Sequence, residues 1–168
     1  MWREDILQSR VPNMVAKVGW THTRPNQGMS REWQTPPEIL EALGPFDDDP
    51  CQPGRTDGLL RPWYGVVWLN PPYGNDMWCW WEKLAQHGNG LGILFARVET
   101  RGFFREIWGK ADALLFLRGR PHFYKDGQRA KGNAGGPTVL VAYGHTAVQR
   151  LRRCGIPGIL TTQWLEKL

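Results

Sequence analysis

Apolar residues along the chain follow two patterns, short continuous runs and runs with helical spacing, and the two patterns alternate. The continuous runs are typical of strands buried on both faces of a sheet. They occupy residues 66–69, 91–96, 113–117 and 138–142, with a shorter one at residues 158–160. Helical spacing is found in residues 76–87, 102–110 and 146–153. Strands that alternate with helices predict an α/β domain with a mainly parallel central sheet.

The chain before the first of these runs has a different character. Residues 1–30 show no sustained period and contain several prolines and glycines, which predicts an irregular N-terminal arm. We expect one ordered domain over residues 31–168. A short helix is predicted to start with Thr35 as its N-cap, Pro36 at the first helical position and Glu38 closing a capping box. A short strand is predicted over residues 46–50, and a polar loop over residues 119–136.

Composition narrows the class of protein only moderately. A length of 168 residues fits one domain, and no apolar run is long enough to span a bilayer or form a signal peptide. Three widely spaced cysteines fit neither a disulfide framework nor a zinc site, so a reducing cytoplasm is expected, that of a host cell if the protein is encoded by a phage. A net charge of +5 is compatible with a polyanionic partner, although many ordinary proteins are equally basic.

Ten tryptophans are unusual for this length, and five of them fall between Trp63 and Trp81. They could stack on nucleic-acid bases. For each one taken singly, a place in the core is the stronger interpretation.

The tetrapeptide Asn70-Pro71-Pro72-Tyr73 directly follows a predicted buried strand. In open α/β sheets, ligands bind beyond the carboxyl ends of the strands. The side-chain oxygen of Asn70 and the backbone carbonyl of Pro71 could accept the two N–H bonds of a planar amine and free its lone pair for methylation. Prolines stiffen the segment because they hold their φ angles and lack an amide N–H. Tyr73 offers a ring on which a flipped-out base can stack. A plain turn is the alternative, because Asn-Pro-Pro forms turns anywhere.

At these residues the chain resembles the phage-type DNA N-6-adenine methyltransferases, a branch of the class I S-adenosylmethionine-dependent methyltransferase superfamily. The resemblance covers roughly residues 31–143. It is carried by an ordered set of stretches, which are residues 32–38, 46–51, 57–59 before Trp63, 67–74, 96–101 and 117–120. It implies a compact, single-domain Rossmann-like methyltransferase fold and transfer of a methyl group from S-adenosylmethionine to N6 of a flipped-out adenine in double-stranded DNA. Because the charge of the sulfonium disappears as the methyl group moves, no metal is required.

The resemblance also implies roles for residues near the cofactor. Asp49-Pro50 is similar to the acidic turn that lies against the cofactor, and Thr35-Pro36 to the element that holds its methionine end. Asp57 resembles an acidic residue that could accept a hydrogen bond from the cofactor's adenine amine, and a solvated turn aspartate is an equal alternative. The Gly-rich loop of the superfamily is only partly present, and no clear acidic residue follows a second strand to bind the cofactor ribose. Asp47 or Asp48 could serve, with a surface-exposed acidic turn as an equal alternative. The implied cofactor contacts are Trp33, Thr35, Pro36, Asp47, Asp49, Pro50, Asp57 and Asn70.

Basic residues after the strand ends and in the polar loop are candidates for contact with DNA phosphates. They are Arg97, Arg101, Arg120, Lys125, Arg129 and Lys131, with Arg118 beside them. A solvated surface charge is an equally good interpretation of each one. The loop over residues 119–136 is long and contains glycine, which suits a mobile segment that contacts DNA.

Several functions share the chemistry of the tetrapeptide. Cytosine N4, an RNA base and a protein glutamine also present planar amines, and a nucleic-acid-binding module that has lost catalysis is a further alternative. The target sequence and the oligomeric state do not follow from the residues.

Overall fold

The computed structural model describes residues 33–52, 54, 57–74 and 76–164 of the chain. The predicted N-terminal arm, residues 1–30, lies outside this range. Strands and helices alternate along the described residues, so the predicted α/β class is confirmed. Within these residues, no helix is both long and apolar enough to cross a membrane.

The central sheet has five strands in the order β1-β2-β6-β3-β7. Their bounds are Val67–Leu69 for β1, Gly90–Phe95 for β2, Thr138–Tyr143 for β6, Ala113–Leu117 for β3 and Gly158–Thr161 for β7. Only β1 and β2 pair in parallel, and the other three pairings are antiparallel. The prediction of a mainly parallel sheet is therefore wrong. The physical reason is that β6 inserts between β2 and β3 and runs against both.

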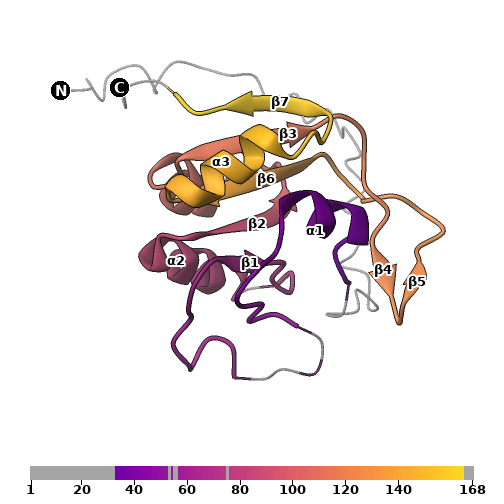
Figure 1. The fold of residues 1–168 in the computed structure, drawn as a ribbon, viewed down its shortest axis with the longest axis horizontal. Helices are drawn as coiled ribbons and strands as arrows, with labels where there is room; N and C mark the ends of the chain where they lie inside the picture. Colours follow the sequence, from indigo (N-terminus) through magenta and orange to yellow (C-terminus); the bar gives the residue numbers. More distant parts are fainter. Residues whose placement is uncertain (1–32, 53, 55–56, 75, 165–168) are drawn as a thin grey trace, which may run out of the picture.

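Strands β1, β2 and β3 nevertheless run in the same direction, because β2 and β3 are both antiparallel to β6. Their carboxyl ends therefore open on one side of the sheet, which we call the carboxyl edge. In Figure 1, β2 and β3 point toward the side on which the small hairpin of β4 (Tyr124–Lys125) and β5 (Gln128–Arg129) lies. The segments that follow β1, β2 and β3 all start at this edge.

Helices cover both faces of the sheet (Figure 1). Helix α2 (Met77–His87) and the π-helix η2 (Phe103–Trp108) pack on one face, and α1 (Pro37–Leu43) packs with α3 (His145–Arg153) on the other. Alternate residues of each strand serve the two faces, as the pleat requires. Leu94 and Leu114, for example, join the core under α2 and η2, whereas Ile93 and Leu115 join the core under α1 and α3.

Tight packing between α2 and the sheet explains a glycine within a strand. A Cβ atom at Gly92 of β2 would lie 2.6 Å from the ring of Trp81, which is fully buried. Trp63 and Trp68 are also buried, and Trp78 and Trp80 pack on the core. The interpretation of these five tryptophans as core residues is confirmed.

Three local predictions are corrected by the structure. Helix α1 starts at Pro37 with Pro36 as N-cap, and no side chain caps it, so the predicted capping box is absent. The Thr35 hydroxyl is instead engaged by the Trp68 indole, 3.1 Å away. The predicted strand over residues 46–50 is reduced to a single parallel bridge between Asp48 and Val67, because only two backbone hydrogen bonds join the segments.

The third correction concerns the polar loop over residues 119–136. It holds the two-stranded hairpin of β4 and β5, whose turn places Asp126 and Gly127 at φ angles of 51° and 73°. Positive φ at both turn residues is the geometry of a type I′ turn, which matches the twist of the flanking strands. The loop is therefore built around a regular β-ribbon.

Candidate functional site

A cavity of about 370 Å³ opens beside the carboxyl end of β1. This volume lies within the range of small-molecule binding sites. Three segments enclose the cavity: the chain leading into α1, the turn after Asp48, and the end of β1. The residues that line it are Trp33, Gln34, Thr35, Pro37, Leu40, Glu41, Asp49, Cys51, Trp68 and Asn70.

Asn70 is held in one orientation by the chain that precedes α1. Its Nδ2 donates a hydrogen bond to the backbone carbonyl of Trp33 at 2.7 Å. A carbonyl oxygen can only accept, so the NH2 group of the amide must face Trp33. The Oδ1 atom is thereby turned away from Trp33, and no described residue donates a hydrogen bond to it. The arrangement leaves a fixed, half-buried acceptor at the cavity.

The rest of the tetrapeptide lies next to Asn70 at the carboxyl edge. Pro71 is buried, and none of the described residues donates a hydrogen bond to its carbonyl. The ring of Tyr73 stacks on Phe95 at the end of β2, with centroids 4.9 Å apart and planes inclined by 25°. Burial raises the pKa of the Tyr73 phenol to about 12, so this ring is neutral at physiological pH. Asn70, Pro71 and Tyr73 thus combine two acceptors with a supported aromatic ring.

The wall of the cavity next to α1 is fixed by a buried hydrogen bond. Trp68 Nε1 donates to Oγ1 of Thr35 at 3.1 Å, and both side chains are almost completely buried. Because the hydroxyl accepts from Trp68, its own proton is available to a second acceptor. The backbone of Trp33 and the hydroxyl group of Thr35 are therefore both held in place at the cavity.

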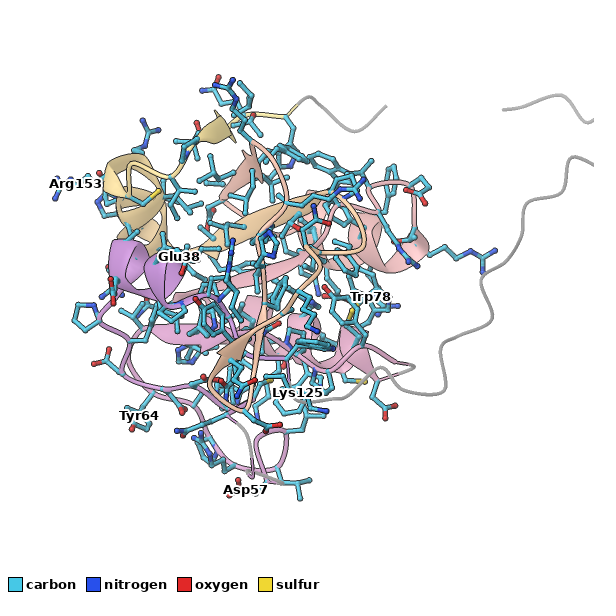
Figure 2. The ribbon with its side chains drawn as sticks, turned by 90° about the vertical axis from the view of Figure 1, so that its right-hand side faces the viewer. Glu38, Asp57, Tyr64, Trp78, Lys125 and Arg153 are labelled. Carbon is cyan, nitrogen blue, oxygen red and sulfur yellow. The ribbon has the colours of Figure 1, made fainter. Side chains whose placement is uncertain are left out.

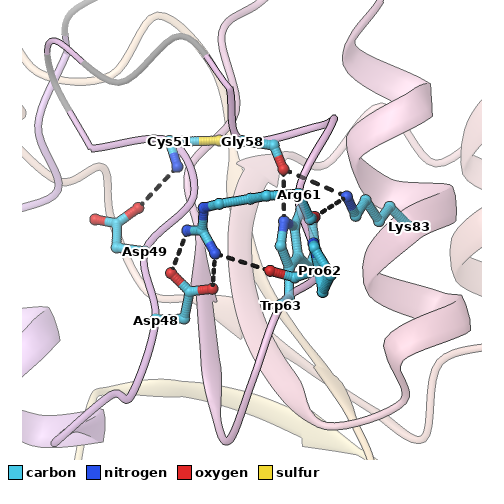
Figure 3. Close-up of polar contacts among 8 residues, drawn as sticks. All are labelled: Asp48, Asp49, Cys51, Gly58, Arg61, Pro62, Trp63 and Lys83. Carbon is cyan, nitrogen blue, oxygen red and sulfur yellow. Dashed lines mark hydrogen bonds and ion pairs between the residues drawn. The ribbon is translucent and has the colours of Figure 1, made fainter.

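The opposite wall, which carries Asp49 and Cys51, is held by an ion pair (Figure 3). The guanidinium of Arg61 donates to both carboxylate oxygens of Asp48, at 2.5 and 2.7 Å. Asp49 Oδ1 accepts from the backbone N–H of Cys51 at 3.1 Å. Burial, and secondly the nearby Asp49 carboxylate, raise the pKa of the Cys51 thiol, which stays protonated. Cys51 therefore lines the cavity as a neutral group, and its thiol is a poor nucleophile.

Lys83 of α2 fixes the loop that carries Arg61. Its ammonium group donates to the carbonyls of Leu59 and Arg61, each at 2.6 Å, and lies 5.0 Å from the centre of the Trp63 ring. Figure 3 shows the bond to Arg61. Burial lowers the pKa of Lys83. The Trp63 indole in turn donates to the carbonyl of Gly58 at 2.7 Å. The loop from Gly58 to Trp63 is thus held in place, and its Arg61 in turn fixes the segment that contains Asp48.

The electrostatic character of the cavity is opposite to that of the chain. Its described lining contains two carboxylates, Glu41 and Asp49, and no lysine, arginine or histidine. The whole chain has a net charge of +5. This lining favours a ligand with cationic or hydroxyl groups over a phosphate. No three His, Cys, Asp or Glu side chains in the described part of the chain are placed to hold a metal ion together.

The structure brings four of the predicted cofactor residues together in the cavity: Trp33, Thr35, Asp49 and Asn70. The other four are not among the lining residues. Asp47 accepts a hydrogen bond from the backbone of Val66 at 2.6 Å, and Asp57 is exposed directly before the loop from Gly58 to Trp63 (Figure 2). Pro36 and Pro50 are buried beside the lining residues Thr35 and Asp49.

The predicted DNA contacts are exposed, and most lie in segments that leave the carboxyl edge. Arg97 and Arg101 follow β2, and Arg120 follows β3. Lys125 and Arg129 lie on the hairpin, and Lys131 follows it. No described acidic side chain forms an ion pair with any of these six residues.

Some lining residues have no counterpart among the sequence predictions. Glu41 has a sequence signal, because Pro37, Leu40 and Glu41 recur at the spacing of one helix face. Gln34 could have been inferred from its position between Trp33 and Thr35. Phe95, the partner of Tyr73, depends on the pairing of distant strands and has no local signal. Comparison of the chain with protein-family models, curated proteins and solved structures finds no significant match.

Proposed function

We propose that the protein is an S-adenosylmethionine-dependent methyltransferase that methylates N6 of adenine in DNA, on a compact Rossmann-like methyltransferase domain. The observation that carries this proposal is the fixed amide of Asn70. Its oxygen is an oriented acceptor at the carboxyl end of a buried strand, beside an acidic cavity of about 370 Å³. Three co-directional strands with helices on both faces agree with the proposed fold.

The properties of the cavity fit the proposed cofactor. S-adenosylmethionine carries a sulfonium and an ammonium group, and its ribose carries two hydroxyls. Glu41 and Asp49 provide carboxylates for such groups, and the Thr35 hydroxyl can donate to the cofactor's carboxylate. Trp33, Leu40 and Trp68 supply an apolar lining for an adenine ring. When bound, the cofactor supplies an electrophilic methyl group.

The residues of the tetrapeptide would act on the target base. An adenine stacked on the face of Tyr73 that Phe95 does not cover would present its amine to two acceptors. Asn70 Oδ1 would accept from one N–H and the Pro71 carbonyl from the other, which would free the lone pair of the nitrogen. As the new N–CH3 bond forms, the S–CH3 bond of the cofactor would break, and the methylated amine would then lose one proton to water. Because Trp33 already holds the Asn70 amide, little reorganisation is needed at the moment of transfer.

Analysis of the methylated nucleoside tests the proposal directly. Duplex DNA is incubated with the protein and S-adenosylmethionine carrying a labelled methyl group, then digested, and the labelled nucleoside is identified. We expect N6-methyladenine from the wild-type protein and a 10²- to 10³-fold lower rate for Asn70→Ala, roughly the loss caused by removing one oriented electrostatic contact. Gln86→Ala, an exposed change on α2, serves as the control. Labelled N4-methylcytosine in place of N6-methyladenine, no label in the DNA, or full activity of Asn70→Ala would overturn the proposal.

A further inference from the structure

The hairpin of β4 and β5 projects from the carboxyl edge within a strongly basic segment of the chain, residues 118–131. Residues 118–131 contain five basic residues and one acidic residue, a net charge of +4, against +5 for the whole chain. Lys125, Gln128 and Arg129 are all exposed. Figure 2 labels Lys125 on the hairpin and Arg153 on α3, well apart from each other. The segment that contains the hairpin is therefore strongly basic, and it is separate from the basic residues of α3.

The hairpin is a rigid ribbon with a defined reach. Its arms pair Tyr124 with Arg129 and Lys125 with Gln128, and the N–H of Ala130 closes the base on the carbonyl of Phe123 at 2.8 Å. Each arm has two residues, which span about 7 Å at a rise of about 3.3 Å per residue, and the turn of Asp126 and Gly127 extends the ribbon further. The major groove of B-DNA is about 8.5 Å deep and admits a two-stranded ribbon. The hairpin therefore has the dimensions to reach the base edges.

Backbone pairing also ties the hairpin to the candidate site. Gln34 and Tyr124 form an antiparallel bridge with two hydrogen bonds, of 2.8 and 3.0 Å. Gln34 lines the cavity, and the adjacent carbonyl of Trp33 holds the Asn70 amide. The ribbon is thus attached to the same short segment that positions Asn70. DNA held by the ribbon would have a defined position relative to that residue.

The register of the ribbon separates two kinds of side chain. Lys125 and Gln128 are directly opposite each other, share one face and flank the turn, whereas Arg129 lies on the other face, one residue further back. A glutamine amide can form two hydrogen bonds with adenine, and a lysine can bond to guanine O6 and N7. Arginine further from the tip is suited to a phosphate contact. The face of Lys125 and Gln128 is therefore suited to reading bases, and Arg129 to anchoring the ribbon.

Building on the proposed function, we propose that this hairpin enters the major groove of the substrate DNA and reads the target sequence through Lys125 and Gln128, with Arg129 on a phosphate. A ribbon whose strands are about 4.8 Å apart covers little more than one base-pair step of about 3.4 Å. The target is therefore short, with discrimination confined to two or three base pairs beside the methylated adenine. A-form RNA has a deep, narrow major groove that excludes such a ribbon.

The test compares the sequence preference of single variants. Duplexes with randomised bases around a central adenine are methylated, and the methylated fraction is sequenced. We expect the wild type to favour particular flanking bases by roughly ten- to a hundredfold. Gln128→Ala should abolish the preference at one position while methylation continues. Arg129→Ala should weaken binding equally to all sequences and lower the slope of log Kd against log salt by about 1. Arg153→Ala, an exposed change on α3, is the charge-matched control and should change neither quantity.

Each outcome bears on one proposal only. An unchanged preference in both Gln128→Ala and Lys125→Ala would overturn the reading role of the hairpin, and so would an RNA duplex pool methylated with the same dependence on Gln128. A salt slope that Arg129→Ala and Arg153→Ala lower equally would overturn the phosphate contact. If the wild-type protein yields no N6-methyladenine in any pool, it is the proposed function that fails. A gel shift with unmethylated DNA then still measures whether the hairpin variants alter binding.

Discussion

Replacing Asn70 with aspartate changes one contact at the centre of the candidate site. The Nδ2 donor that lies 2.7 Å from the Trp33 carbonyl becomes an oxygen, so two acceptors face each other unless the new carboxyl is protonated. Leaving a buried carbonyl without its donor costs about 1–3 kcal/mol. Protonation restores the donor, and 1.36 kcal/mol corresponds to one pKa unit, so the introduced carboxyl should titrate about one to two units above its usual value near 3.9.

This raised pKa determines the sign of the effect on stability. A carboxyl whose pKa is higher in the folded than in the unfolded protein stabilises the fold at low pH. That contribution is lost as the pH rises through about 5–6. We therefore expect Asn70→Asp to lower the free energy of unfolding by about 1–3 kcal/mol relative to wild type at pH 7.5, and by less at pH 4.5. Urea denaturation at both pH values measures the difference.

Asn70→Ala is the matched control, because it loses the same hydrogen bond and has no group that titrates. Its deficit relative to wild type should be the same at pH 4.5 and 7.5. If the deficit of Asn70→Asp is also independent of pH, Trp33 does not orient the amide. The reasoning that assigns Oδ1 to the substrate would then be refuted without any measurement of activity.

Three further changes test the surroundings of the site. Trp68→Phe removes the donor to Thr35 and should lower the free energy of unfolding, measured by urea denaturation, by about 1–3 kcal/mol. The effects of Trp68→Phe and Thr35→Val should be non-additive, and full additivity would contradict the hydrogen bond between the two side chains. Gly127→Val places a branched side chain at a φ of 73° and should cost about 1–2 kcal/mol, whereas Gly132→Val, where a Cβ meets nothing within 4 Å, should be neutral; equal effects would contradict the turn geometry. Burial raises the pKa of Tyr73 to about 12, so the free energy of unfolding should fall as the pH rises from about 10 toward 12, because the unfolded chain loses the phenol proton first. Tyr73→Phe should reduce this fall. Phenolate absorbance showing that all four tyrosines titrate near 10 would contradict the raised pKa.

The elements of the fold could be predicted from the chain because their periodicities are local. A run such as Val67-Trp68-Leu69 is buried on both faces, and the spacing of Trp81 and Leu84 matches one face of α2. Of the four lining residues that were predicted, Asn70 directly follows the end of β1, whereas Trp33, Thr35 and Asp49 were expected from the family resemblance. Positions that follow strand ends gather at one edge whenever the strands run in the same direction. The local pattern was therefore sufficient to place Asn70 at the cavity, but it did not identify the other residues that line it.

The periodicity of apolar residues does not predict strand order or pairing between distant segments. The burial of β6 is identical whether it runs with or against its neighbours, so periodicity contains no information on its direction. The ion pair between Asp48 and Arg61 joins residues 13 apart, and it determines where the Asp49 wall lies. The hairpin was different, because Asp126-Gly127 is itself a strong hairpin signal. The polar composition of residues 119–136 led to the prediction of a loop, although the turn residues Asp126 and Gly127 indicate a hairpin.

The segment from Trp33 to Thr35 connects all of the proposed roles of the protein. Its first carbonyl holds Asn70, its middle residue pairs with the hairpin, and its last side chain is bonded to Trp68 in the cavity wall. A ligand that contacts this segment in the cavity would therefore also hold Gln34, which pairs with the hairpin, and the carbonyl of Trp33, which orients Asn70. Binding at one place then changes the affinity at the other by the same factor in both directions, as linkage requires. Under the proposed function, S-adenosylmethionine and DNA should therefore bind cooperatively, because all three contacts are made by residues 33–35.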